Sequence, residues 1–207
     1  MARAAATKGQ TRIQREKTEQ ILEAALEVFA SFGFRGSTID QIAAQSGLSK
    51  PNILYYFDGK EAIHAVLLGQ LLDKWLEPLE SLADSNTPID EICAYVHRKL
   101  EMARDFPRES RLFANEILQS APRILNELEG RLKALADEKA ALIQSWVDAG
   151  KISSVDPHHL LFSIWSTTQH YADFDVQVRA VLGECEGDCY QTAQAHLDHM
   201  FRALLKP

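Results

Sequence analysis

The stretch from Ser37 to Lys60 reads STIDQIAAQSGLSKPNILYYFDGK and predicts two short helices that meet at a sharp corner. Gly47 stands where the chain must reverse, and only glycine adopts a positive φ at little cost. Ser49 suits the N-cap of the second helix, and Pro51 suits its first turn, where a missing N–H costs little. The pattern is a helix-turn-helix, a unit whose second helix can enter the DNA major groove.

The sequence on both sides of this unit predicts helices only. Helical spacing of apolar residues runs over 13–32 and stops at Gly33, and Ser37 is expected to cap the next helix. Prolines and polar linkers divide the rest into further helices, about nine in all, while residues 173–187 read as less regular. The expected fold class is therefore all-α, with a three-helix domain over 1–60 and a larger helical domain over 61–207.

The charge is distributed unevenly along the chain. The net charge of −7 argues against a nucleic-acid partner when taken alone. Residues 1–60, however, hold eight Lys/Arg and six Asp/Glu, or +2, whereas residues 61–207 hold fourteen and twenty-three, or −9. The positive potential therefore accompanies the helix-turn-helix, as a DNA-binding segment requires.

The three cysteines and the hydropathy bear on the compartment. No secretory signal and no apolar stretch long enough to span a bilayer are visible, so we expect a cytoplasmic protein that needs no disulfide. Cys185, Cys189, His196 and His199 have a metal-like look, but their spacing does not match the usual zinc patterns. Neither a metal nor a cofactor is expected.

Two longer motifs give the chain a family resemblance. The segments FGFRGSTIDQIAAQSGLS at 32–49 and NILYYFDGKEAI at 52–63 resemble the DNA-binding domain of TetR-family transcriptional regulators. The resemblance implies a ligand-responsive regulator, usually a repressor. Because one helix-turn-helix has a small footprint, a dimer would bind an inverted-repeat operator.

A second resemblance covers most of the larger domain. QLLDKWLEPL, RLFANEIL, LKALADEK and IWSTTQHYADF look like the regulators of pyrimidine utilisation within that family. This resemblance implies a homodimer that forms through C-terminal helices, and a small planar effector, uracil or thymine, bound inside the domain. The stretch GECEGDCYQTAQAHLDHM at 183–200 departs from the subgroup.

Candidate DNA contacts come from the helix-turn-helix and from the two helices next to it. Polar side chains of the recognition helix can reach bases or phosphates, and one of its two tyrosines is expected to be partly core. The basic residues before this unit are read equally well as solvated charges or as phosphate contacts. The candidates are Arg12, Arg15, Lys17, Thr38, Gln41, Ser49, Lys50, Asn52, Tyr55, Tyr56 and Lys60.

Candidate effector contacts combine aromatic walls with an amide. Trp165 and Gln169 are four residues apart and share one helix face, and a pyrimidine ring needs both kinds of partner. Tryptophans at helical spacing also fit a simple core, and Glu116 fits an ion pair with Arg111 or another cation. The candidates are Trp75, Phe113, Glu116, Trp165, Gln169, Tyr171 and Asp173.

Two rival functions remain open from the sequence. An enzyme in the larger domain would use carboxylates such as Glu116, but no nucleophile or cofactor motif accompanies them, so we expect no enzyme. A constitutive architectural or partner-binding protein would instead show a dry, fully packed core around Trp165 and Gln169.

Overall fold

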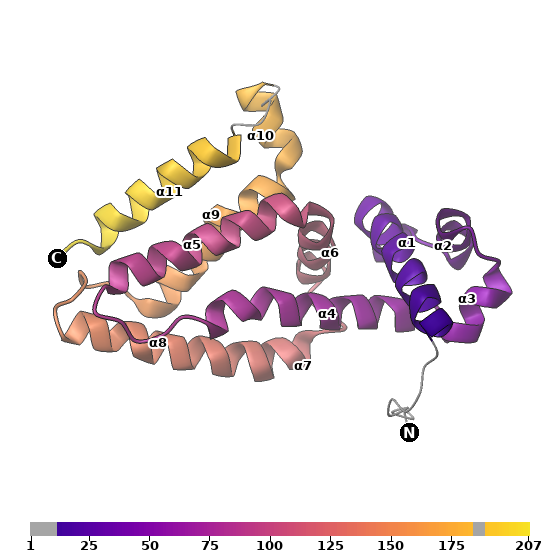
Figure 1. Cartoon of the computed structure of the whole chain (residues 1–207), viewed down its shortest axis with the longest axis horizontal. Coiled ribbons are helices and arrows are strands. Elements are labelled where there is room, and N and C mark those ends of the chain that lie inside the picture. Colours follow the sequence, from indigo (N-terminus) through magenta and orange to yellow (C-terminus); the bar gives the residue numbers. More distant parts are fainter. Residues whose placement is uncertain (1–11, 184–188) are drawn as a thin grey trace. The chain divides into compact units, whose positions relative to one another are not determined.

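The computed structural model describes residues 12–183 and 189–207, and within these ranges every regular element is a helix. The expected all-α class is confirmed. The elements are α1 (Arg12–Gly36), α2 (Ile39–Ser46), α3 (Lys50–Tyr56), α4 (Lys60–Glu80), α5 (Pro88–Asp105), α6 (Pro107–Leu118), α7 (Leu125–Glu127), the π-helical turn η1 (Leu128–Leu132), α8 (Lys133–Asp148), α9 (Pro157–Asp173), α10 (Asp175–Leu182) and α11 (Cys189–Leu205) (Figure 1).

The chain divides into two compact units, Met1–Leu68 and Gly69–Pro207, and the division falls inside α4. Unit 1 comprises α1, α2, α3 and the first part of α4. Its core is built from fully buried side chains that arrive from all four helices: Ile21, Ala25, Phe29, Ile42, Ile53, Ile63 and Leu68. Burial of this apolar surface, rather than helix propensity, holds such short helices in place.

The corner between α2 and α3 forms as the glycine predicts. Gly47 has φ 66° and ψ 19°, and its N–H turns back to the carbonyls of Ala43 and Ala44. The expected cap of α2 is wrong by one residue. Thr38 is the N-cap and forms a capping box with Gln41. Ser37 is instead buried, and its hydroxyl donates to the Gly33 carbonyl at 2.6 Å.

In unit 2, α5 lies between α9 and α11 and packs against both (Figure 1). The core includes Leu79, Ile92, Val96, Ile143 and Trp146, all almost fully buried. The indole Nε1 of Trp146 donates to Asp84 at 2.8 Å, which satisfies its one polar atom.

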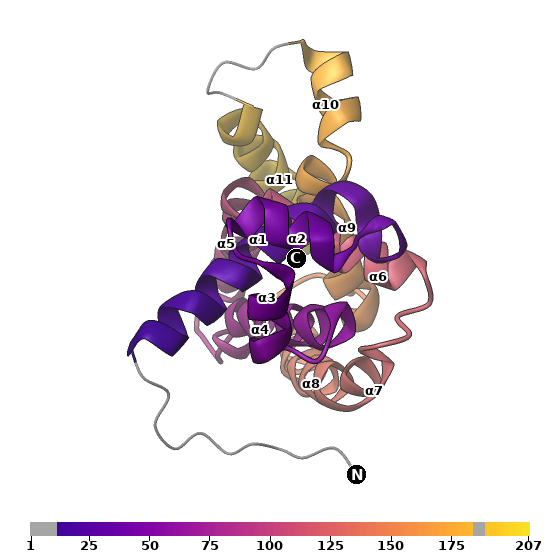
Figure 2. The same cartoon turned by 90° about the vertical axis from the view of Figure 1, so that its right-hand side faces the viewer.

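Two segments of unit 2 differ from the sequence-based expectation. Residues 175–182 form α10, which projects from the rest of unit 2 in both views (Figure 2). The proline at 122 and the highly charged stretch up to Gly150 predict one long helix. In the structure the helix starts only at Leu125 and contains η1, one wide turn of i→i+5 type.

Candidate DNA-binding surface and effector cavity

The recognition helix α3 presents the expected side chains to solvent. Ser49 caps it by accepting from the Asn52 N–H at 3.4 Å. Ile53 is fully buried and anchors the helix, whereas the Tyr55 side chain is 73% exposed. Tyr56 is half-buried and meets Tyr55 edge to face at 5.1 Å between ring centroids. Tyr56 is thus the tyrosine that turns partly toward the core.

Three other candidates hold the unit together with bonds of their own. Thr38 and Gln41 bind each other through the capping box, with the Thr38 N–H 2.7 Å from Gln41 Oε1. The Lys50 ammonium lies 2.9 Å from an Asp40 carboxylate oxygen in an exposed ion pair. Such exposed pairs are weak, so Lys50 can leave Asp40 for a phosphate at little cost.

Lys60 has a structural role that the sequence did not reveal. Its ammonium donates to the Phe34 carbonyl at 2.9 Å and to the Ser37 carbonyl at 2.8 Å. It also lies 4.5 Å from the centroid of the Phe34 ring. Lys60 therefore ties the start of α4 to the end of α1 with charge-assisted bonds.

The basic residues at the start of α1 are exposed or partly exposed. Arg12 pairs with Glu16 at 2.8 Å, and Lys17 donates to Gln20 at 2.9 Å. Arg15 is exposed. Arg12 and Lys17 can exchange these exposed contacts for a phosphate at little cost.

Unit 2 contains a cavity of about 70 Å³ between α4, α5, α6, η1 and α9. Four of the seven effector candidates line it, namely Trp75, Phe113, Trp165 and Gln169. The remaining lining residues are Leu72, Leu76, Leu79, Tyr95, Lys99 and Leu132. The walls are thus mostly aromatic or aliphatic, with a few polar groups, as in small-molecule sites generally.

Several polar atoms of the cavity lining can form more hydrogen bonds than they form with the described residues. The Trp165 indole donates to the Tyr95 hydroxyl at 2.7 Å, which leaves the Tyr95 proton available. Burial raises the pKa of Tyr95, so that hydroxyl stays neutral. The Trp75 Nε1 is buried without a hydrogen-bond partner in the described part of the chain. The Gln169 amide likewise makes no hydrogen bond to a described residue.

Lys99 is the one charged residue among the lining residues that sequence reasoning missed. Its side chain is only 3% exposed, and burial lowers its pKa from 10.5 to about 7, while the Asp173 carboxylate acts in the opposite direction. Its Nζ lies 5.3 Å from the centroid of the Trp75 ring. The available signal was a lysine on the apolar face of α5, one turn after Tyr95.

The other three effector candidates do not line the cavity. Glu116 is buried and accepts from the Arg123 backbone N–H at 2.8 Å and from its guanidinium at 2.9 Å. Glu116 is therefore paired with a cation, Arg123, which is one of the two interpretations that the sequence allowed. Asp173 accepts from the Ser110 hydroxyl at 2.5 Å. Tyr171 packs against the core with its ring near Tyr190.

The family models match both units. Residues 21–66 match the model described as bacterial regulatory proteins, tetR family, and residues 68–207 match the YcdC-like protein, C-terminal region. The chain belongs to the TetR family. It is a helix-turn-helix transcriptional regulator.

Named relatives and solved structures agree with this assignment. The HTH-type transcriptional regulator RutR of Escherichia coli K12 is 52% identical over 167 residues, which covers 81% of this chain and 79% of RutR. The uncharacterized regulator YfiR of Bacillus subtilis is 28% identical over 147 residues, or 69% of this chain and 71% of YfiR.

Among solved structures, AibR in complex with isovaleryl coenzyme A and operator DNA has a TM-score of 0.70 at 19% identity, covering 92% of this chain and 99% of AibR. A TetR-like regulator from Rhodococcus sp. RHA1 has a TM-score of 0.68 at 22% identity, covering 95% of this chain and 98% of that one. At these identities the likeness concerns the fold alone.

The cysteines and the metal-like spacing can be placed only in part. Cys93 is a buried free thiol, whereas Cys189 is disulfide-bonded, which corrects the expectation that no disulfide is needed. Cys185 lies outside the described residues. Within the part of the chain that the structure describes, no cluster of His, Cys, Asp and Glu could hold a metal ion, and no helix could cross a membrane.

Proposed function

We propose that the regulator binds an inverted-repeat operator as a homodimer through its C-terminal helices, and that a small planar effector, uracil or thymine, releases it. The single observation that carries the effector part is the cavity of unit 2, with its aromatic walls and unpaired polar groups. In this proposal the protein acts in the cytoplasm, beside its DNA, as a repressor without a catalytic step.

The chemistry of the cavity suits a pyrimidine ring. Such a ring has two flat apolar faces and an edge where C=O and N–H groups alternate. Trp75, Trp165 and Phe113 offer surfaces for the faces. Gln169 offers both a donor and an acceptor for the edge. A cavity of about 70 Å³ also favours a compact ligand over a long-chain one.

The DNA contacts proposed for each protomer lie on α3 and around it. Lys50, Asn52 and Tyr55 are exposed and can reach bases or phosphates. The register on the DNA backbone would be fixed by Thr38, Gln41, Ser49, Tyr56 and Lys60. Phosphates farther along the duplex would be contacted by Arg12, Arg15 and Lys17. Because each phosphate contact releases counterions, operator affinity should fall steeply with salt concentration.

Release requires that the effector and the operator favour different conformations. The helix α4 runs without interruption from Lys60, in unit 1, to Glu80, in unit 2, and Trp75 of the cavity lies on it. An effector that favours one tilt of α4 would change the spacing of two recognition helices. A coupling free energy of about 1–3 kcal/mol is typical of such linked sites.

The decisive experiment is calorimetry with uracil and thymine, followed by operator binding with and without the ligand. Gln169→Leu should weaken uracil binding about tenfold because the variant loses its hydrogen bonds to the ring edge. Gln144→Leu is the matched control, since Gln144 is an exposed glutamine of α8 that bonds Asp148. Absence of uracil and thymine binding, or an operator affinity indifferent to bound uracil, would refute the proposal.

The rival functions receive less support. An architectural protein would need a dry and fully packed core at Trp165 and Gln169, where the structure has the cavity instead. A hidden enzyme would use Glu116, whose two oxygens are both engaged by Arg123. Turnover of uracil by the purified protein would reopen the enzyme alternative.

A further inference from the structure

A buried lysine faces the proposed effector cavity and makes no hydrogen bond to any residue that the structure describes. Lys99 lines the cavity, and its side chain is 3% exposed. Its Nζ makes no hydrogen bond to a described residue. This Nζ lies 5.3 Å from the centroid of the Trp75 ring. A buried polar group left in this state costs free energy, so a bound ligand that supplies an acceptor gains the bond.

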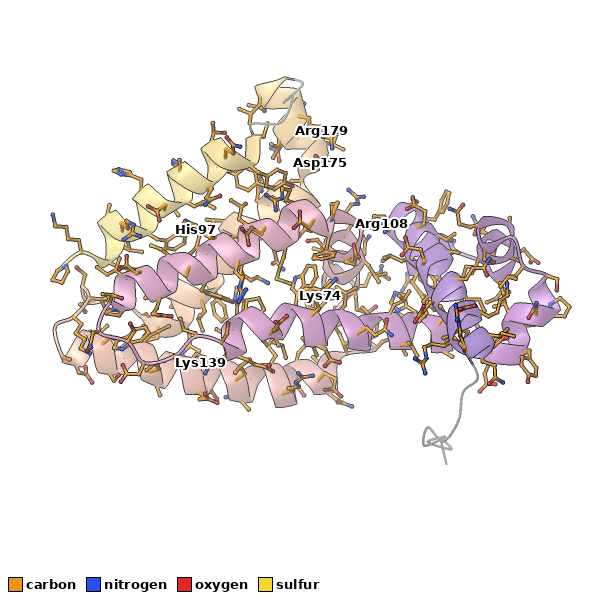
Figure 3. The ribbon with its side chains drawn as sticks, in the orientation of Figure 1. Lys74, His97, Arg108, Lys139, Asp175 and Arg179 are labelled. Carbon is orange, nitrogen blue, oxygen red and sulfur yellow. The ribbon has the colours of Figure 1, made fainter. Side chains whose placement is uncertain are left out.

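The other charged groups around Lys99 belong to different contacts. His97, two residues earlier on α5, lies on the side that faces α11, with its Nε2 3.2 Å from Asp198 (Figure 3). From α9, Asp173 attracts Lys99 at longer range, but its carboxylate accepts from Ser110 of α6. Arg111 of α6 and His170 of α9 also act on that carboxylate.

The remaining cavity walls bring no charge of either sign. Trp75 and three leucines come from α4, Phe113 from α6, Leu132 from η1, and Trp165 and Gln169 from α9. Lys99 is therefore the one ionisable amine among the residues that line the cavity, and no lining residue is a carboxylate. The cavity as a whole is complementary to a ligand whose polar edge is electron-rich.

We propose that Lys99 is the specificity-determining residue of the effector site, and that it selects rings whose carbonyl edge carries negative charge. This inference rests on the proposed function and names the chemical class of the effector more closely: a cyclic imide whose ring N–H is acidic. Lys99 donates to a carbonyl oxygen of that imide, while Gln169 forms hydrogen bonds with the other polar groups of the ring edge.

The charge balance of this contact is simple. The ammonium form of Lys99 pairs with the imidate, which forms when the ring N–H gives its proton to the solvent and whose negative charge lies on its carbonyl oxygens. The two charges are opposite, so the pair brings no net charge into the cavity. Ion pairs of this kind are stronger in a low dielectric than in water.

The test compares uracil with 5-fluorouracil, two rings of nearly equal size of which the fluorinated one has the more acidic N–H. The full-length protein should bind 5-fluorouracil more tightly than uracil, by about tenfold for each pKa unit by which its ring N–H is more acidic. Lys99→Met should weaken uracil binding roughly 10- to 100-fold and should abolish the preference for the fluorinated ring. Lys99→Arg, which keeps the charge, should retain the preference.

A matched control variant is available on α8. Lys139 is also buried, at 8% exposure, but it pairs with Glu138 at 2.8 Å and does not line the cavity (Figure 3). Lys139→Met should leave both ring affinities unchanged, and circular dichroism checks that all variants are folded. If uracil binds the wild type and Lys99→Met alike, or if the preference survives in Lys99→Met, this inference is wrong and the proposed function stands. If neither ring binds the wild type, both are wrong.

Discussion

The ligand-free protein should become more stable when Lys99 is replaced by methionine. Lys99 is buried, its ammonium has no hydrogen bond to a described residue, and burial lowers its pKa to about 7. Methionine fills a similar volume without a charge. Replacement of buried ionic groups by well-packed apolar ones stabilises proteins by about 1–4 kcal/mol in known cases.

The magnitude follows from the two pKa values. The pKa of Lys99 falls from its ordinary value of 10.5 to about 7 in the folded protein. This difference corresponds to roughly 5 kcal/mol of unfavourable free energy for the charged lysine. Between pH 7 and pH 10.5, Lys99 holds its proton in the unfolded chain but has lost it in the folded chain. The free energy of unfolding of the wild type therefore rises with pH across this range. The stability advantage of Lys99→Met should therefore be largest at pH 6 and should narrow by roughly 2–3 kcal/mol by pH 9.

Urea unfolding followed by tryptophan fluorescence provides the assay. All three tryptophans, Trp75, Trp146 and Trp165, lie in unit 2, so the signal reports the unit that contains Lys99. Protein concentration must be held constant, because the stability of the proposed dimer depends on it. Other titrating groups are common to both proteins and cancel in the difference.

Two results would refute this reasoning. One is a Lys99→Met variant less stable than the wild type at pH 6. The other is a stability difference that does not change between pH 6 and pH 9, which would mean that Lys99 does not titrate within that range.

Further substitutions test the bonds described for each unit. Gly47→Ala should destabilise unit 1 by about 1–2 kcal/mol in calorimetric unfolding, because alanine is strained at φ 66°. Lys60→Met should destabilise the same unit by about 2 kcal/mol through loss of its two bonds to carbonyls, and an unchanged melting temperature would contradict that role. Lys50→Ala should leave stability within about 0.5 kcal/mol, but should weaken operator binding and reduce its salt slope by about one. Glu116→Gln should destabilise unit 2 by about 1–3 kcal/mol in urea while uracil affinity stays constant; a large loss of affinity would return Glu116 to the site.

The helix-turn-helix was predictable because its signals are local. A glycine that needs a positive φ and a serine before a proline each act within a few residues, and the structure places both as expected. The cap of α2 was misplaced by one residue because Ser37 and Thr38 are both good caps in isolation. Burial of Ser37 against α1 decided between them, and that is a tertiary effect.

The cavity was predictable only in part because it is assembled from five separate elements. Trp165 and Gln169 share a helix turn, so their spacing revealed them. Glu116 lies on α6 and Arg123 in the turn after it, so their pairing left no periodic trace. Lys99 was missed because a lone lysine in an amphipathic helix usually extends to solvent along its apolar stem. The packing around α5 prevents this.

The wide turn η1 sets the orientation of α7 relative to α8 through the length of the chain. A π-type turn accommodates one residue more than an α-helical turn does. Removal of a single residue between Leu128 and Leu132 would restore regular α-helix and rotate everything before it by roughly 100° about the axis. Leu132 and the buried side chains of α8 follow the deletion and would keep their places. A one-residue deletion would thus turn α7 to a new face of unit 2 without any substitution in the core.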